Sequence, residues 1–183
     1  ADIHVLLPAD AQPQTRQRLG AQVDLWLEQL DDSMSAAPLT AKRLDRERCR
    51  LTLCTSGSSG EPKLIDKSLG QLANEVQALE ALWGERLGNA LIIGSVAAQH
   101  IYGLLFRVLW PLCAGRVFLS RAQPFPEDLQ LASLPHPTFA WITSPALLKR
   151  MGDNLDWAAL SRVRQVFSSG GALPADAAAS VQQ

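Results

Sequence analysis

The chain contains the stretch Leu53-Cys54-Thr55-Ser56-Gly57-Ser58-Ser59-Gly60-Glu61-Pro62-Lys63. It follows a short apolar run and places four hydroxyl side chains and two glycines in six successive positions, shortly before a lysine. Glycines let backbone N–H groups converge on one ligand, hydroxyls add further donors, and the lysine adds a full positive charge. These properties suit a loop that binds the polyphosphate of a nucleotide.

Three other interpretations of this stretch are less consistent with its spacing. A Walker A loop needs four residues between its glycines and then Gly-Lys-Ser/Thr, whereas two residues separate Gly57 from Gly60 and Leu64 follows Lys63. A nucleophile elbow needs Gly-x-Ser-x-Gly, and Gly57-Ser58-Ser59-Gly60 is one residue too short. A flexible Gly/Ser linker is seldom placed between two apolar runs of strand character.

The rest of the chain alternates between strand and helix patterns. Strands are predicted at 3–7, 51–54, 63–66, 90–95, 116–119, 138–142 and 163–167, and helices at 14–30, 68–83 (with Ser68 as the cap), 101–113, 127–131, 144–151 and from 174 onward. Strand–helix alternation of this kind predicts an α/β fold, layered, with a largely parallel sheet flanked by helices. The loop at 55–63 would then join two strands, unlike a Walker loop, which opens directly into a helix.

Composition narrows the class of protein. The 183 residues suit one domain or a large part of a bigger one. With 17 basic and 18 acidic side chains, the chain has no charge excess of the kind that binds nucleic acid or anionic membrane. No apolar run approaches the ~20 residues that span a bilayer, and the first residues lack a secretory pattern. We therefore expect a cytoplasmic protein with no nucleic-acid partner and no membrane span.

The cysteines and histidines predict no metal site. The cysteines lack CxxC spacing and are expected to be small buried thiols, and the histidines are too few and too scattered to hold a metal ion. These residues are Cys49, Cys54, Cys113, His4, His100 and His136.

The pattern Thr-Ser-Gly-Ser-Ser-Gly-x-Pro-Lys closely resembles the phosphate loop of the adenylate-forming superfamily, which includes acyl-CoA synthetases, aryl-CoA ligases, peptide-synthetase adenylation domains and luciferases. The chain departs from that pattern at Ser59, where Thr is more frequent, and at Leu64, where Gly is usual. A frequent Thr-His pair downstream is replaced by Ser68-Leu69. None of these departures removes a phosphate donor, and together they indicate a divergent branch.

Two later segments also resemble motifs of this superfamily. His100-Ile101-Tyr102-Gly103 is similar to an element that lines the acyl pocket, although Ala97-Ala98-Gln99 replaces the usual proline and aromatic. A histidine at a helix start beside a glycine can border a carboxylate ligand, or it can simply cap the helix. Ser168-Ser169-Gly170-Gly171-Ala172-Leu173-Pro174 resembles a segment that runs beside the adenine and acyl groups, although it could equally be an ordinary strand-to-helix turn.

The resemblance extends from Leu51 to Pro174 and identifies residues 1–183 as part of the large N-terminal domain of an adenylate-forming enzyme. The family's later motifs and its C-terminal lysine domain are absent from these residues, so we expect them to be inactive alone. The resemblance implies that the parent protein activates a small carboxylic acid with ATP and Mg²⁺ to acyl-AMP. It then transfers the acyl group to a thiol, either CoA or the phosphopantetheine of an acyl carrier protein.

The resemblance also implies roles for individual residues. Phosphate contacts fall to Thr55, Ser56, Gly57, Ser58, Ser59, Gly60 and Lys63, adenine contacts to Gly170, Gly171 and Ala172, and the acid pocket to His100 and Gly103. Lys63 is the candidate catalytic residue, because its charge can offset that of the departing pyrophosphate. No metal ligand is predicted. Two alternatives are a nucleotide-binding module without catalysis and a serine hydrolase that uses Ser58 or Ser59 with His100.

Overall fold

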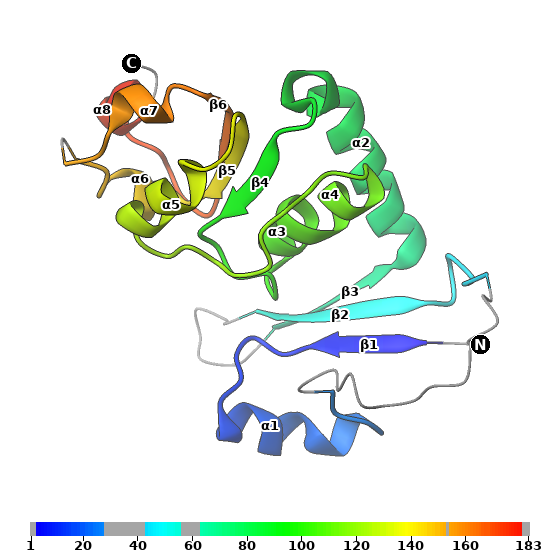
Figure 1. The fold of residues 1–183 in the computed structure, drawn as a ribbon. Helices are drawn as coiled ribbons and strands as arrows, with labels where there is room; N and C mark the ends of the chain where they lie inside the picture. The colour runs from blue at the N-terminus through cyan, green and yellow to red at the C-terminus, as the bar shows by residue number, and fades with distance from the viewer. Residues whose placement is uncertain (1–2, 28–42, 56–62, 153, 181–183) are drawn as a thin grey trace. The chain divides into compact units, whose positions relative to one another are not determined.

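A computed structural model describes residues 3–27, 43–55, 63–152 and 154–180. The chain divides into two compact units, residues 1–72 and 73–183. Each unit contains a three-stranded sheet (Figure 1). Three of the four strand pairings among the described residues are parallel. The predicted α/β class with a parallel sheet flanked by helices is therefore confirmed.

In the first unit, β2 (Arg50–Thr55) lies between β1 (His4–Leu7) and β3 (Lys63–Ser68). The β1 strand pairs with β2 in parallel, and β3 pairs with β2 in antiparallel orientation. The central strand buries Thr52, Leu53 and Cys54, which is the expected burial of a strand with neighbours on both sides. The sequence predicted all three strands to within about two residues at either end.

Helix α2 (Leu69–Leu87) begins where β3 ends, as predicted from Ser68. The backbone N–H of Gln71 donates to Ser68 Oγ at 3.1 Å, and the Ser68 N–H donates to Gln71 Oε1 at 2.9 Å. This reciprocal pair satisfies two backbone donors that have no partner inside the helix, and so it starts the helix at a defined residue.

The second unit is built on the parallel sheet β4 (Leu91–Gly94), β5 (Phe139–Thr143) and β6 (Val163–Ser168), with β5 in the middle. Helices cover both faces of this sheet (Figure 1). Leu91, Ile93, Phe139 and Trp141 pack with buried residues of α5 (Pro126–Ser133), α6 (Pro145–Leu148) and α7 (Trp157–Leu160). On the other side, Phe167 contacts the rings of Trp83, Phe106 and Trp110.

One continuous helical stretch follows β4, as predicted for 101–113. It comprises α3 (Ile101–Gly103), a π-helical segment at Leu104–Leu109 and α4 (Trp110–Cys113). π-Helical segments are rare and occur often at functional sites. The last helix, α8 (Ala175–Ser180), begins directly after Pro174, close to its predicted start.

Four predictions need correction. The helix predicted at 14–30 is, among the described residues, α1 (Pro13–Leu19) with a 3₁₀ turn at Gly20–Gln22, and residues 23–27 are not helical. The strand predicted at 116–119 is a single bridge between Ile92 and Phe118. The helix predicted to reach 151 ends at Leu148. Finally, α7 was not predicted, although Asp156 caps it by accepting from the Ala159 N–H at 3.0 Å.

Cysteine burial was predicted correctly for two of the three thiols. Cys49 and Cys54 are buried, whereas Cys113 is exposed. Cys113 is the last residue of α4, and neighbouring Leu112 is also 63% exposed. The apolar pattern predicted the helix here without showing which face it buries.

Candidate functional site

The segment between β2 and β3 is closed at its base by the strand ladder. Six residue pairs align the two strands, from Arg50 opposite Ser68 to Thr55 opposite Lys63. The two strands predicted on either side of this segment are therefore confirmed. The loop residues Ser56, Gly57, Ser58, Ser59 and Gly60, and the side chain of Thr55, lie outside the described residues, so their phosphate contacts stay predictions.

Lys63 is the first residue of β3, and its side chain is exposed. It stands directly opposite Thr55, so the two ends of the predicted phosphate loop are held in register. A charged side chain at such a point can reach a polyanion bound by the loop without losing packing, because it takes no part in the buried core of its unit.

A chain of hydrogen-bonded polar side chains crosses the first sheet. His4 Nε2 lies 2.5 Å from Thr52 Oγ1, and the Thr52 hydroxyl donates to Asp66 Oδ1. Thr52 is only 3% exposed, so both contacts satisfy a hydroxyl that would otherwise be costly to bury. These bonds link β1, β2 and β3, and they hold in place the two strands that carry the predicted loop.

In the second unit, three hydroxyl residues lie where the parallel strands end. We call this edge of the sheet, marked by the three residues, the carboxyl edge. Ser95 follows β4, Thr143 ends β5, and Ser168 ends β6 opposite Thr143. The Ser95 N–H donates to the Ile142 carbonyl at 2.9 Å, and Ser95 Oγ donates to Thr143 Oγ1 at 3.1 Å. Ligands of α/β proteins bind beyond the carboxyl ends of parallel strands.

The sequence analysis did not single out this row of hydroxyls. A signal was available, because each hydroxyl residue directly follows or ends an apolar strand run. The row could therefore have been found from the predicted strand ends.

The carboxyl edge brings together two of the predicted site segments. The chain leaves β4 through residues 95–100 toward His100, and it leaves β6 through residues 169–174. Because β4 and β6 both pair in parallel with β5, both segments emerge at the same edge of the sheet. Two segments that are about 70 residues apart in sequence therefore lie at the same edge of the sheet, as a common pocket requires.

His100 is exposed and is the residue before α3, with φ −92° and ψ 147°. Its side chain makes no cap hydrogen bond, so the helix-cap interpretation lacks the contact that would support it. Gly103 is buried, and a Cβ there would lie 2.0 Å from the Ala97 carbonyl oxygen. The chain's own backbone therefore occupies the space that Gly103 leaves open, and its contact with a substrate stays a prediction.

Gly170 adopts φ +94°, a conformation that residues with a side chain rarely take. Gly171 and Ala172 are exposed like it, and the turn presents its backbone to solvent. Such a surface can approach a planar ring closely. The arrangement suits the adenine contact, which stays a prediction.

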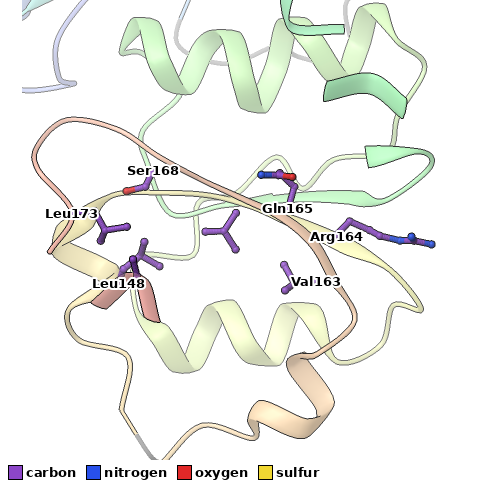
Figure 2. Close-up of a pocket in the computed structure, with 8 residues that line it drawn as sticks. Leu148, Val163, Arg164, Gln165, Ser168 and Leu173 are labelled. Carbon is purple, nitrogen blue, oxygen red and sulfur yellow. The ribbon is translucent and has the colours of Figure 1, made fainter. Parts of the chain in front are cut away.

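A cavity of about 300 Å³ lies along β6, beside the predicted adenine segment (Figure 2). It is lined by Leu148, Val163, Arg164, Gln165, Val166, Ser168, Leu173 and Ala178. The Leu148 and Leu173 side chains face the same space, whereas Arg164 extends away from it (Figure 2). A mostly apolar wall with a few polar groups is usual for small-molecule sites.

Two buried hydroxyl groups near the carboxyl edge make no hydrogen bond to any described atom: those of Tyr102 and Ser168. The Tyr102 hydroxyl lies by the Thr143 backbone but does not meet hydrogen-bond geometry. Burial raises the pKa of Tyr102, so the phenol stays neutral and can donate. Buried polar groups are nearly always paired, so these two stand out among the described residues.

The residues that the structure describes contain neither a candidate metal site nor a candidate membrane-spanning helix. No three His, Cys, Asp or Glu side chains gather where they could hold a metal ion. No helix in the same part of the chain has the length and apolar character needed to cross a membrane.

A glycine- and hydroxyl-rich segment between antiparallel strands, together with a parallel sheet whose carboxyl edge carries polar residues, is typical of nucleotide-binding α/β proteins. Comparison with known proteins specifies the family. The sequence profile of the AMP-binding enzymes matches residues 3–183, and the chain belongs to that family. Over 65 residues it is 37% identical to a 4-coumarate–CoA ligase from Cereibacter sphaeroides, an alignment that covers 35% of this chain and 16% of that ligase.

Solved structures of ligases share the fold. A malonyl-CoA ligase in a ternary product complex with methylmalonyl-CoA and AMP matches 100% of this chain and 40% of its own, with a TM-score of 0.71 and 25% identity. A benzoate CoA ligase from Burkholderia xenovorans LB400 matches 78% of this chain and 28% of its own, with a TM-score of 0.56 and 21% identity. The chain thus spans less than half the length of these relatives.

Proposed function

We propose that the full-length protein is an ATP-dependent acid:thiol ligase. In the first half-reaction, a carboxylate oxygen of the acid attacks the α-phosphorus of ATP, and pyrophosphate leaves. In the second, a thiolate attacks the acyl carbon of the acyl-AMP, and AMP leaves. Membership of the AMP-binding family supports this chemistry, and so does the similarity to CoA ligases.

One observation carries the proposal: Thr55 and Lys63 pair across β2 and β3 and so close the base of the donor-rich segment. In the proposed mechanism this loop holds the β- and γ-phosphates. Lys63 offsets the charge that develops on pyrophosphate, an electrostatic effect of about 3 kcal/mol for one well-placed donor. Mg²⁺ would bind through the phosphate oxygens, because this ion needs few protein ligands when a nucleotide supplies them.

The second unit supplies the remaining contacts in this proposal. The exposed turn at Gly170, Gly171 and Ala172 lies beside the adenine and the acyl group, and His100 and Gly103 border the acid. Support comes from two buried hydroxyls, that of Ser168 at the carboxyl edge and that of Tyr102 near it, which have no partner among the described atoms. The acid itself is a small carboxylic acid, and the thiol is CoA or the phosphopantetheine of an acyl carrier protein.

A nucleotide-binding module without catalysis is the second candidate, since it would share the loop and the family profile. The serine hydrolase hypothesis is much weaker. A nucleophile elbow places its serine between a strand and a helix, whereas the segment here joins β2 to β3, two antiparallel strands.

The test is ATP–pyrophosphate exchange by the full-length protein against a panel of aliphatic, aromatic and amino acids. We expect exchange that depends on one class of acid, followed by thioester formation when CoA or a carrier protein is added. ATP binding without exchange for any acid would favour the non-catalytic module. Labelling of Ser58 or Ser59 by a fluorophosphonate would favour the hydrolase.

A further inference from the structure

Arg107 is a buried cation within the π-helical segment that follows β4. The residue is only 3% exposed, and no described carboxylate pairs with it. Its guanidinium donates instead to three backbone carbonyls: Val96, Leu119 at 3.4 Å and Ser120 at 3.2 Å. Its Nε has no partner among the described atoms. Burial lowers the pKa of Arg107, yet a guanidinium stays protonated in proteins.

A charge in such a place is costly to bury. Removing an ion from water costs several kcal/mol even after relaxation, and an apolar side chain of similar volume often replaces a buried charge without loss of stability. The three carbonyls reduce this cost, but Nε has no partner among the described atoms. Packing alone is therefore a poor explanation for an arginine, and the positions of the carbonyls suggest a better one.

The three carbonyls belong to segments that leave the same edge of the second sheet. Val96 lies in the segment between β4 and His100, and Leu119 and Ser120 follow the bridge between Ile92 and Phe118. One planar guanidinium with fixed donor directions thus joins two separate chain segments. The Leu119 N–H in turn donates to the Ile92 carbonyl at 3.0 Å, which ties the second segment to β4.

Two glycines allow this arrangement. A Cβ at Gly94 would lie 2.2 Å from Arg107 Cδ, so the arginine stem passes directly over the end of β4. A Cβ at Gly103 would lie 2.0 Å from the Ala97 carbonyl oxygen. Gly103 and Arg107 are four residues apart and so lie on one face of the helix. This face contacts the successive residues Val96 and Ala97, which lie in the segment that leads to His100.

We propose that Arg107 is a positioning residue, which fixes residues 95–100 against the carboxyl edge and thereby orients His100 toward the acid substrate. This inference rests on the proposed function for its kinetic consequence. Arg107 itself contacts no substrate. It acts through the backbone carbonyl of Val96, which lies in the segment that leads to His100.

The test compares Arg107→Met, Arg107→Lys and Gly94→Ala in the full-length protein. We expect kcat/KM for the acid to fall roughly ten- to a hundredfold in Arg107→Met, because small displacements of an orienting group carry costs of that order. KM for ATP should stay unchanged. Arg107→Lys should recover little of the loss, since one ammonium group cannot serve both segments. Gly94→Ala should reproduce the defect, because it displaces the arginine stem.

Two controls separate positioning from general destabilisation. Arg121→Met removes an exposed arginine of the same region and should leave all constants unchanged. Glu80→Gln weakens a salt bridge elsewhere in the second unit and should lower the melting temperature without an acid-specific effect. An Arg107→Met enzyme that loses melting temperature but keeps its kcat/KM for the acid would overturn the proposal. Full recovery in Arg107→Lys would overturn it too, because charge alone would then suffice.

Amide hydrogen exchange provides a readout that does not depend on activity. Arg107→Met should speed exchange in residues 95–103 while the strands β5 and β6 keep their protection. Unchanged exchange at 95–103 in the folded variant would contradict the positioning role even if the protein activates no acid. Conversely, faster exchange there in a protein without acid-dependent pyrophosphate exchange would support the positioning and reject only the proposed function.

Discussion

Thr55 and Lys63 form the last cross-strand pair of β2 and β3, directly opposite each other at the base of the predicted phosphate loop. Opposed residues of an antiparallel pair have Cβ atoms about 5 Å apart. The ladder therefore sets the separation between the two ends of the predicted phosphate loop.

The first prediction concerns Lys63. In the full-length protein, Lys63→Ala should lower the rate of ATP–pyrophosphate exchange by about 10²-fold, the usual cost of removing one donor from a developing anion. The melting temperature should not change, because the side chain is exposed. Lys149→Ala, which removes another exposed lysine, is the matched control. Exchange at the wild-type rate would remove Lys63 from the mechanism.

The second prediction uses two adjacent glycines. Gly170→Ala should lower the free energy of unfolding by about 1–2 kcal/mol, because φ +94° is strained for any residue with a Cβ. Gly171→Ala should be nearly neutral, since its new Cβ would meet only Pro145 Cγ at 3.9 Å. Chemical denaturation of both variants gives the comparison. Equal losses would show that the backbone conformation at Gly170 carries no special cost.

The third prediction concerns the salt bridge between Glu80 and Arg116, which stabilises the second unit. Arg116 Nη1 and Nη2 donate to the two Glu80 oxygens at 2.5 and 2.8 Å, and Trp110 Nε1 donates to Glu80 Oε2 at 2.7 Å. The Arg116 hydrogen bonds hold the pKa of Glu80 below its ordinary 4.5. A lowered pKa means that the stabilisation is present above 4.5 and is lost as the pH falls through the folded-state value.

Glu80→Gln should therefore lower the melting temperature at neutral pH, and the difference from wild type should vanish in strong acid. The side chain is 45% exposed, so solvent screening limits the effect to less than about 1 kcal/mol. Glu85→Gln, an exposed carboxylate of the same helix, is the control. A difference that persists undiminished in acid would mean that the packing of Glu80, rather than its charge, stabilises the unit.

The fourth prediction concerns thiol reactivity. Cys113 should react quickly with a disulfide reagent, whereas Cys49 and Cys54 should react only on unfolding, because they are buried. Burial also raises the pKa of the Cys54 thiol, which lowers its fraction of reactive thiolate. Cys113→Ser should abolish the fast phase. A second fast thiol would show that the core of the first unit opens readily.

The fifth prediction concerns residues 1–183 as an isolated polypeptide. We expect no detectable acyl-AMP, because holding ATP productively also needs the ribose and closing-lysine contacts that the family resemblance places in later motifs. Binding energy missing from remote parts of a ligand reduces the chemical rate as well as the affinity. A single-turnover assay with labelled ATP and a mixture of acids tests this. Acyl-AMP above the enzyme-free blank would contradict it.

Local chemistry in the sequence predicted much of this protein. The phosphate-loop hairpin follows from an apolar run, a glycine- and serine-rich segment and a second run, all within 18 residues of chain, Leu51 to Ser68. The start of α2 depends on Ser68, whose side chain accepts a hydrogen bond from the backbone of Gln71, three residues away. The strands of the parallel sheet depend on short apolar runs. Such features were predictable because the interactions that form them lie close together in the chain.

Tertiary packing decided the rest. Leu19 and Leu27 have helical spacing, yet only Leu19 is buried, Leu27 is exposed, and α1 ends at Leu19. The exposure of Cys113 and the burial of Arg107 likewise depend on which helix face meets the sheet, and spacing alone does not specify that face. Nothing in the sequence distinguishes Arg107 from other charged residues of predicted helices. Its contacts with Val96, Leu119 and Ser120 arise only when the sheet brings their segments to one edge.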